Sequence, residues 1–207
     1  QTASGCTDII IHTLERYFTK PGVTSLALTD GLAEALLRNV MRNVKLALKA
    51  PDDYDARAEI MWAGTLSHND ITGDRSQGDW ASHQLEHELG GMFDIAHGAG
   101  LAAIWGSWAR YVLKQDPCRF AQLAVNVLNV PYSFGNDEKT ALEGIAAMED
   151  FFHSIGMPTS ISDMDIDLTD AQIKELAHKC SFMGRRTIGG FVTLNAADME
   201  NIYRMAR

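Results

Sequence analysis

The chain has 207 residues, of which 46% are hydrophobic and 22% are charged. This composition is typical of a globular domain and excludes a chain that is disordered over most of its length. Eighteen Lys and Arg against 27 Asp and Glu give a net charge of −9, and this charge repels nucleic-acid phosphates and anionic lipid headgroups. We therefore expect no nucleic-acid partner and no membrane partner.

The cysteine pattern and the chain start indicate the setting. Cys6, Cys118 and Cys180 lie far apart, and an odd number of cysteines cannot close a disulfide framework within one chain. No apolar stretch approaches the roughly 18 residues that span a bilayer, and no signal peptide is visible. We expect a cytoplasmic, reducing environment. The chain begins at Gln1 without Met, which we interpret as a cut through a longer polypeptide.

Apolar residues recur at spacings of three and four along most of the chain, which is the pattern of helices. Nine helices are predicted in chain order: Thr7 to Phe18, Asp30 to Leu48, Asp52 to Leu66, Trp80 to Leu89, His97 to Lys114, Cys118 to Leu128, Glu138 to Ile155, Asp170 to Phe182 and Asn195 to Met205. Only Ile188 to Leu194 alternates weakly, as a strand would. The sequence therefore predicts an all-α helical bundle, with residues 1–207 as one domain.

Caps and chain breakers predict where these helices begin and end. The stop signals are Lys20, Pro21 and Gly22 after the first helix and Gly90 and Gly91 after the fourth. The expected N-caps are Asp30, Asp79, Asp137, Asn195 and either Thr169 or Asp170. The longest loop is predicted over His68 to Asp79, with Gly73 and Gly78 as breakers.

Asp8 and His12 form the first candidate site. Residues four apart lie on the same side of a helix, so both side chains can bind one ion. By itself such a pair is more often a hydrogen-bonded pair on a solvated face. Here Ile9, Ile10 and Ile11 fill the gap between them, and an acidic group among apolar neighbours needs a partner.

Three histidines form the second candidate site. His83 and His87 repeat the four-residue spacing, and His97 follows the Gly90 and Gly91 pair. Imidazoles and a carboxylate are ligands that Zn²⁺ and Fe²⁺ accept, and a bundle can bring them together from separate helices. Four ligands close such a site, so one histidine is surplus. The spacing does not say which one.

Other chemical motifs are weaker. The segment after His87 is not His-Glu-x-x-His, which excludes the common metalloprotease motif. Gly98 to Ala103 matches G-x-G-x-x-A, but no strand precedes it, so close helix packing explains the small residues better than nucleotide binding does. The remaining histidines, His68, His153 and His178, are interpreted as ordinary surface or core residues.

Two stretches resemble the C-terminal half of the iron-containing alcohol dehydrogenases, and within them the butanol dehydrogenase and aldehyde reductase group. The first is Gln1 to Asp8 with His12 to Tyr17. The second runs from Ala63 through His68 and Asn69, then Asp79 to Leu89, then Asp94 to Gly98. The likeness continues to Gly189, Gly190 and the final helix. It implies the C-terminal α domain of the dehydroquinate synthase-like and iron-containing alcohol dehydrogenase fold.

The resemblance implies a ligand set and a reaction. It maps the metal ligands, for Fe²⁺ or Zn²⁺, onto Asp8, His12, His83 and His97. It places His87 near the nicotinamide and substrate, as a candidate for proton transfer or positioning. In family members the metal polarises the oxygen of an alcohol or aldehyde for hydride transfer with NAD(P)H, and the full-length enzyme is expected to be a homodimer. The N-terminal NAD(P)-binding domain is absent from these 207 residues, so we expect this chain alone to be inactive.

Two other functions stay open. A metal-dependent hydrolase on a helical bundle would use bound water as the nucleophile and Glu88 or Asp94 as the base. A helical interaction module would carry its histidines incidentally. A βαβ unit with a glycine-rich turn upstream in the parent gene separates the dehydrogenase from the hydrolase, and metal analysis separates both from the module.

Overall fold

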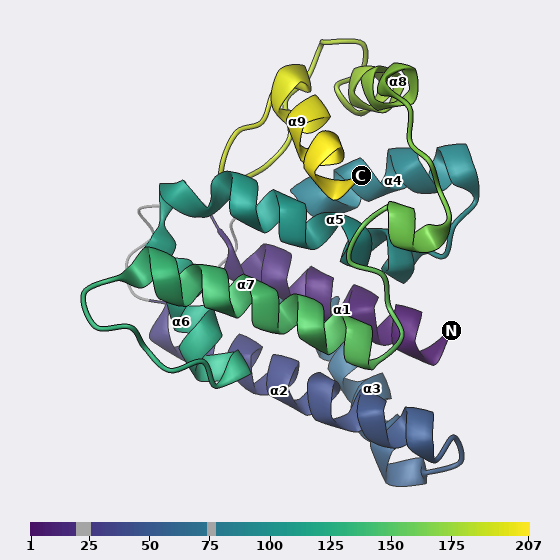
Figure 1. Ribbon diagram of the computed structural model, residues 1–207. Helices are drawn as coiled ribbons and strands as arrows, with labels where there is room; N and C mark the ends of the chain where they lie inside the picture. The colour runs from purple at the N-terminus through teal and green to yellow at the C-terminus, as the bar shows by residue number, and fades with distance from the viewer. Residues whose placement is uncertain (20–25, 74–77) are drawn as a thin grey trace.

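The structure is a computed structural model that describes residues 1–19, 26–73 and 78–207. Within these ranges it contains nine α-helices, two short 3₁₀ helices and no strand (Figure 1). The elements are α1 Thr2–Tyr17, α2 Ala27–Lys49, α3 Tyr54–Ser67, α4 Ala81–Phe93, α5 His97–Val112, η1 Leu113–Gln115, α6 Pro117–Leu128, α7 Asp137–Ser154, η2 Ser162–Met164, α8 Asp170–Cys180 and α9 Ala196–Ala206. The all-α prediction is confirmed, and the weak alternation before α9 gives a single antiparallel bridge, Ile188 to Leu194.

Several predicted helix ends are wrong. Helix α1 begins at Thr2, five residues before the expected start, and α2 already includes Asp30 in its first turn. The cap of α7 is Asn136, whose side chain accepts from the backbone N–H of Lys139. Asp137 is therefore the first helical residue, where its charge favours the helix N-terminus. The predicted stop at Lys20, Pro21 and Gly22 lies outside the described residues.

Two predicted caps are confirmed by their hydrogen bonds, and a third is wrong. Asn195 caps α9, where its side chain accepts from the backbone of Ala197 and Asp198. Thr169, one of the two expected candidates, caps α8 in a capping box with Gln172. Asp79 is not the cap of α4, because Trp80 occupies that position, although the Asp79 carboxylate still accepts from Ala81 N–H.

Helix α4 passes through Gly90 and Gly91 instead of ending there, and it continues to Phe93. A Cβ at Gly90 would lie 2.9 Å from Glu86 Oε1, whereas a Cβ at Gly91 would meet nothing within 4 Å. Gly90 therefore makes room for a side chain one turn earlier. It is not a chain terminator.

Helix α1 is central to the bundle (Figure 1). It packs against α2 and α3 on one side and against α4 and α5 on the other, while α6 pairs with α7 and α8 pairs with α9. Ile10, Ile11 and Leu14 of α1 are fully buried as a result. A helix with partners on both sides has little surface open to solvent, so the polar residues of α1 face other helices inside the molecule. None of the described helices is both long and apolar enough to cross a membrane.

Candidate metal centre

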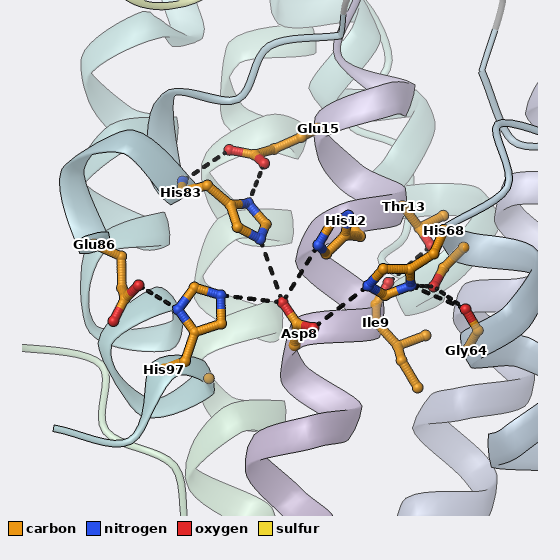
Figure 2. Close-up of polar contacts among 12 residues, drawn as sticks. Asp8, Ile9, His12, Thr13, Glu15, Gly64, His68, His83, Glu86 and His97 are labelled. Atoms are coloured by element: carbon orange, nitrogen blue, oxygen red, sulfur yellow. Dashed lines mark hydrogen bonds and ion pairs between the residues drawn. The ribbon is translucent and has the colours of Figure 1, made fainter. Parts of the chain in front are cut away.

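Four predicted site residues converge on one carboxylate oxygen. Asp8 Oδ1 lies 3.3 Å from His83 Nε2, 3.4 Å from His97 Nε2 and 3.6 Å from His12 Nε2 (Figure 2). Asp8 and His12 come from α1, His83 from α4 and His97 from α5. Three imidazoles from three helices therefore present the same nitrogen to the same oxygen.

The turn before α4 fixes His83 beside α1. Asp79 N–H donates to the Glu15 carbonyl oxygen at 2.7 Å, and this bond ties the turn to α1. Gly78 has a φ of +65°, and a Cβ there would lie 3.0 Å from the same carbonyl. Trp80 then adopts the left-handed conformation, with φ of 60°, and α4 begins at the next residue. His83 consequently lies in the first turn of α4, facing Asp8.

The start of α5 fixes His97 by a close contact with α1. A Cβ at Gly98 would lie 2.0 Å from the Ser4 carbonyl oxygen, so only glycine allows this approach. The Gly98 N–H donates to Ser4 Oγ at 3.1 Å. Because Ser4 precedes Asp8 by one helical turn, this contact holds His97 next to Asp8. The G-x-G-x-x-A string thus serves helix packing, as the sequence analysis predicts.

The distances from Asp8 Oδ1 match those between the ligands of one metal ion. The ligand atoms of Asp8, His12 and His83 all lie within 4.8 Å of one another, and His97 adjoins them through its contact with Asp8 Oδ1. Ligand atoms at 2.0–2.2 Å from a tetrahedral ion are separated from one another by about 3.4 Å. The three distances from Asp8 Oδ1 to imidazole nitrogens, 3.3, 3.4 and 3.6 Å, are of this size. Three neutral imidazoles with one carboxylate form a donor set that both Zn²⁺ and Fe²⁺ accept.

The charges at the site lead to the same conclusion. Burial opposes the ionisation of Asp8, but hydrogen bonds with His83 and His97 outweigh it and hold its pKa well below the ordinary value. Hydrogen bonds with Asp8 and Glu86 raise the pKa of His97 to about 10. Burial lowers the pKa of His83, but hydrogen bonds with Asp8 and Glu15 outweigh it and raise that pKa to about 9. These acidic side chains favour positive charge at the point where the imidazoles meet, and a divalent cation would supply that charge.

His12 has a different electrostatic environment. Its burial and the neighbouring charge of His83 lower its pKa to about 3. Its Nδ1 lies 3.4 Å from Arg16 Nη1, whose shorter hydrogen bond is to the Ser67 carbonyl oxygen at 2.8 Å. A neutral imidazole is the form that ligates a metal. The low pKa keeps His12 in this form, whereas His83 and His97, whose pKa values are raised, would release a proton on binding an ion.

His87, the predicted catalytic candidate, lies at the edge of the cluster. Its ring stacks on that of His97 with centroids 5.5 Å apart, and the residue is exposed. One of its nitrogens lies within 4.8 Å of a ligand atom of Glu86 and of His97. His87 therefore faces outward beside the four converging residues and is not one of the groups around Asp8 Oδ1.

The structure brings three further residues to the site that are not among the predicted ones: Glu15, Glu86 and His68. Glu15 Oε2 accepts from His83 Nδ1, Glu86 Oε2 accepts from His97 Nδ1, and His68 Nε2 lies 3.6 Å from Asp8 Oδ2 (Figure 2). Both glutamates carry a recognisable signal. Glu15 lies three residues after His12, and Glu86 lies three residues after His83, so each shares a helix face with a candidate ligand. His68 follows the last residue of α3, and no periodicity marks it.

Residues 2–207 match a family model that is described as "Fe-containing alcohol dehydrogenase family, C-terminal". NADH-dependent butanol dehydrogenase A of Clostridium acetobutylicum is 35% identical over 205 residues, which are 99% of this chain and 51% of that protein. NADPH-dependent aldehyde reductase YqhD of Escherichia coli is 34% identical over 213 residues, covering 100% of this chain and 52% of that protein. The chain spans about half the length of these curated relatives.

Two solved structures are similar to this chain over its whole length. The aldehyde reductase YqhD from E. coli superposes with a TM-score of 0.91 and 32% identity, covering 100% of this chain and 53% of that one. NADH-dependent butanol dehydrogenase A from Thermotoga maritima superposes with a TM-score of 0.90 and 30% identity, covering 100% of this chain and 52% of that one.

Proposed function

The chain belongs to the Fe-containing alcohol dehydrogenase family, and on this premise we propose that it is the metal-binding half of an NAD(P)-dependent alcohol dehydrogenase or aldehyde reductase. Two of its relatives are a butanol dehydrogenase and an aldehyde reductase. Their names support a small alcohol or aldehyde as the substrate of the whole enzyme. We propose a homodimer for that enzyme, as the family resemblance implies.

One observation carries this proposal: three imidazole nitrogens lie 3.3–3.6 Å from Asp8 Oδ1. Asp8, His12, His83 and His97 would hold the ion. An ion held there would supply Lewis acidity to the oxygen of an alcohol or aldehyde, while the nicotinamide supplies the hydride chemistry. His83 is 5% exposed and the side chain of His97 is 42% exposed, so the cluster is buried on one side and open on the other.

We assign His87 a role beside the ion, in proton transfer or substrate positioning. The support is its place: it is exposed and stacked on His97, outside the group of ligands. A substrate that approaches the open side of the cluster therefore passes this imidazole. Because His87 is not among the groups that surround Asp8 Oδ1, its replacement by Asn should leave metal binding intact and reduce turnover in the whole enzyme.

The hydrolase alternative receives less support. Its candidate bases are Glu88 and Asp94, and within the described part of the chain neither side chain forms a hydrogen bond or an ion pair with the cluster. Burial raises the pKa of Cys180 and of Tyr203, and the charge of Glu88 adds a smaller contribution to both, so Glu88 lies toward α8 and α9. The named relatives are oxidoreductases, so the dehydrogenase is the function we propose.

Metal analysis of single-residue variants tests the proposed ligands. We expect the 207-residue chain, reconstituted with Fe²⁺ or Zn²⁺ and desalted, to retain one ion per chain. Asp8→Asn, His12→Ala, His83→Ala and His97→Ala should each lose most of it, because each removes a ligand from a four-ligand site. His178→Ala removes an exposed histidine on α8 and is the matched control. Equal metal content in His83→Ala and in the control would contradict the proposal.

A further inference from the structure

Two buried carboxylates lie behind the candidate ligands. Glu15 is 0% exposed and Glu86 is 2% exposed. A buried carboxylate is costly unless it is paired and hydrogen-bonded. Among the described residues, the charged partner of each is an imidazole and not a Lys or Arg: Glu15 contacts His83 and Glu86 contacts His97 (Figure 2). Each contact uses Nδ1, the nitrogen that points away from Asp8.

Glu15 uses both of its oxygens on His83. Oε2 accepts from the imidazole Nδ1, and Oε1 accepts from the backbone N–H of the same residue at 3.2 Å. The proton of a neutral His83 therefore lies on Nδ1, and Nε2 carries the lone pair. That nitrogen lies 3.3 Å from Asp8 Oδ1. Glu15 thus fixes both the position of the first turn of α4 and the orientation of the His83 ring.

Glu86 occupies a space that two glycines create. A Cβ at Gly100 of α5 would lie 2.8 Å from Glu86 Cγ and from its Oε1, and a Cβ at Gly90 of α4 would lie 2.9 Å from Oε1. With both positions open, Glu86 Oε2 reaches His97 Nδ1. His97 Nε2 then faces Asp8 Oδ1 at 3.4 Å. The same arrangement therefore recurs at a second ligand, with a carboxylate from a different helix.

We propose that Glu15 and Glu86 are positioning residues, which fix the Nδ1–H tautomer of His83 and His97 and aim the Nε2 lone pair of each at the metal. The inference rests on the proposed metal centre. A carboxylate that accepts from a ligating histidine also makes that imidazole a stronger donor, and the loss of such a partner lowers metal affinity by about 10- to 100-fold.

The two glutamates should differ in their tolerance of glutamine. An amide offers one acceptor oxygen and one donor NH₂ group. Glu15 accepts with both oxygens. In Glu15→Gln the NH₂ group therefore faces either the Nδ1–H or the backbone N–H of His83, and both of these are donors. Glu86 meets His97 through Oε2 alone, so Glu86→Gln can keep its oxygen toward Nδ1. We expect Glu15→Gln to weaken Zn²⁺ binding by about 10- to 100-fold, Glu86→Gln to weaken it less, and Glu86→Leu to weaken it as much as Glu15→Gln.

Glu34→Gln is the matched control for the removal of a buried carboxylate. Glu34 is 7% exposed and accepts from Tyr17, Gln122 and Asn126, all of which lie apart from the cluster. Its replacement by Gln should leave Zn²⁺ affinity at the wild-type value. Circular dichroism of each variant reports whether the helices have formed.

The experiment is a competition between the chain and a chelator for Zn²⁺, combined with NMR detection of the histidine tautomers in the Zn²⁺-loaded wild type. We expect the ring proton of His83 and of His97 on Nδ1. Wild-type affinity in Glu15→Gln and Glu86→Leu, or the ring protons on Nε2, would overturn this inference alone. Failure of the wild type to bind Zn²⁺ would instead overturn the proposed function, and the positioning role with it. Because the NMR measurement uses the wild type, it remains decisive even where a variant does not fold.

Discussion

Asp79 is a buried carboxyl group that joins the start of α4 to the loop before α9. It is 3% exposed and accepts from the backbone N–H groups of Ala81, Gly190 and Phe191 at 3.1, 3.0 and 2.9 Å. Burial, with a smaller contribution from the charge of Glu15, raises its pKa to about 7, and the three N–H donors only partly oppose this. The turn that positions His83 therefore contains a group that titrates in the neutral range.

This pKa predicts a pH-dependent stability. The ordinary pKa of the group is 3.8, so the native chain binds the proton more tightly than the unfolded chain does. The stability that this provides is complete below pH 3.8 and is lost as the pH rises through about 7, with a slope of up to about 1.4 kcal/mol per pH unit. Urea unfolding from pH 4 to pH 8 should therefore show a steeper decline for the wild type than for Asp79→Asn. Parallel curves for the two proteins would contradict this prediction.

At the residue scale, the sequence predicts the groups around Asp8 Oδ1 but not the groups behind them. Asp8 and His12 stand out because three isoleucines separate them, and His83, His87 and His97 stand out by their number. The spacing leaves open which histidine is surplus, and only the resemblance selects His87. Glu15 and Glu86 each share a helix face with a candidate ligand, but a buried glutamate looks like a surface glutamate in sequence, so this spacing alone does not single them out. His68 has no such spacing, and its partner lies on another segment.

At the scale of helices, periodicity predicts the elements but not all of their ends. The side-chain hydrogen bond that makes Asn136 the cap of α7 depends on backbone angles, and two adjacent polar residues leave the choice open. Gly90 and Gly91 carry the usual signal for a helix end. The helix continues because Gly90 provides room for Glu86, and this requirement comes from the site and not from local preference.

Replacement of two helical glycines by alanine is expected to change the free energy of unfolding in opposite directions. Gly98→Ala places a Cβ 2.0 Å from the Ser4 carbonyl oxygen, where backbone on both sides has to move. We expect it to lower the free energy of unfolding by about 1–3 kcal/mol and to weaken metal binding through His97. Gly91→Ala enters open space in α4 and should raise the free energy of unfolding by about 0.5–1 kcal/mol. Urea unfolding measures both, and destabilisation by Gly91→Ala equal to that by Gly98→Ala would refute the packing argument.

At the scale of the whole molecule, the bundle brings the site together around α1. That helix carries Asp8, His12 and Glu15 and packs against α4 and α5, which carry the other candidate ligands. The site is therefore built within the described part of the chain. Hydride transfer also needs a nicotinamide cofactor, and neither a strand nor a nucleotide-binding glycine turn occurs in residues 1–19, 26–73 and 78–207.

Because the candidate metal site lies in this chain and no nucleotide-binding turn is described in it, we expect the chain to bind metal without catalysing hydride transfer. The 207-residue chain should bind a divalent ion but should not oxidise NADH or NADPH in the presence of butyraldehyde. A polypeptide that also carries the half found in the relatives and not in these 207 residues should do both. Absorbance at 340 nm follows the reaction. Aldehyde-dependent oxidation of NADH or NADPH by the chain alone would show that these 207 residues bind the cofactor, and it would contradict this prediction.

X-ray absorption at the iron and zinc edges, on the chain reconstituted with each ion, shows which side chains bind the ion. We predict one ion per chain with three imidazoles and one carboxylate in its first shell, and one imidazole fewer in His83→Ala wherever ion is retained. A fourth imidazole would add His68 to the ligands. An oxygen-only shell, unchanged in His83→Ala, would contradict the proposal that Asp8, His12, His83 and His97 form a metal centre.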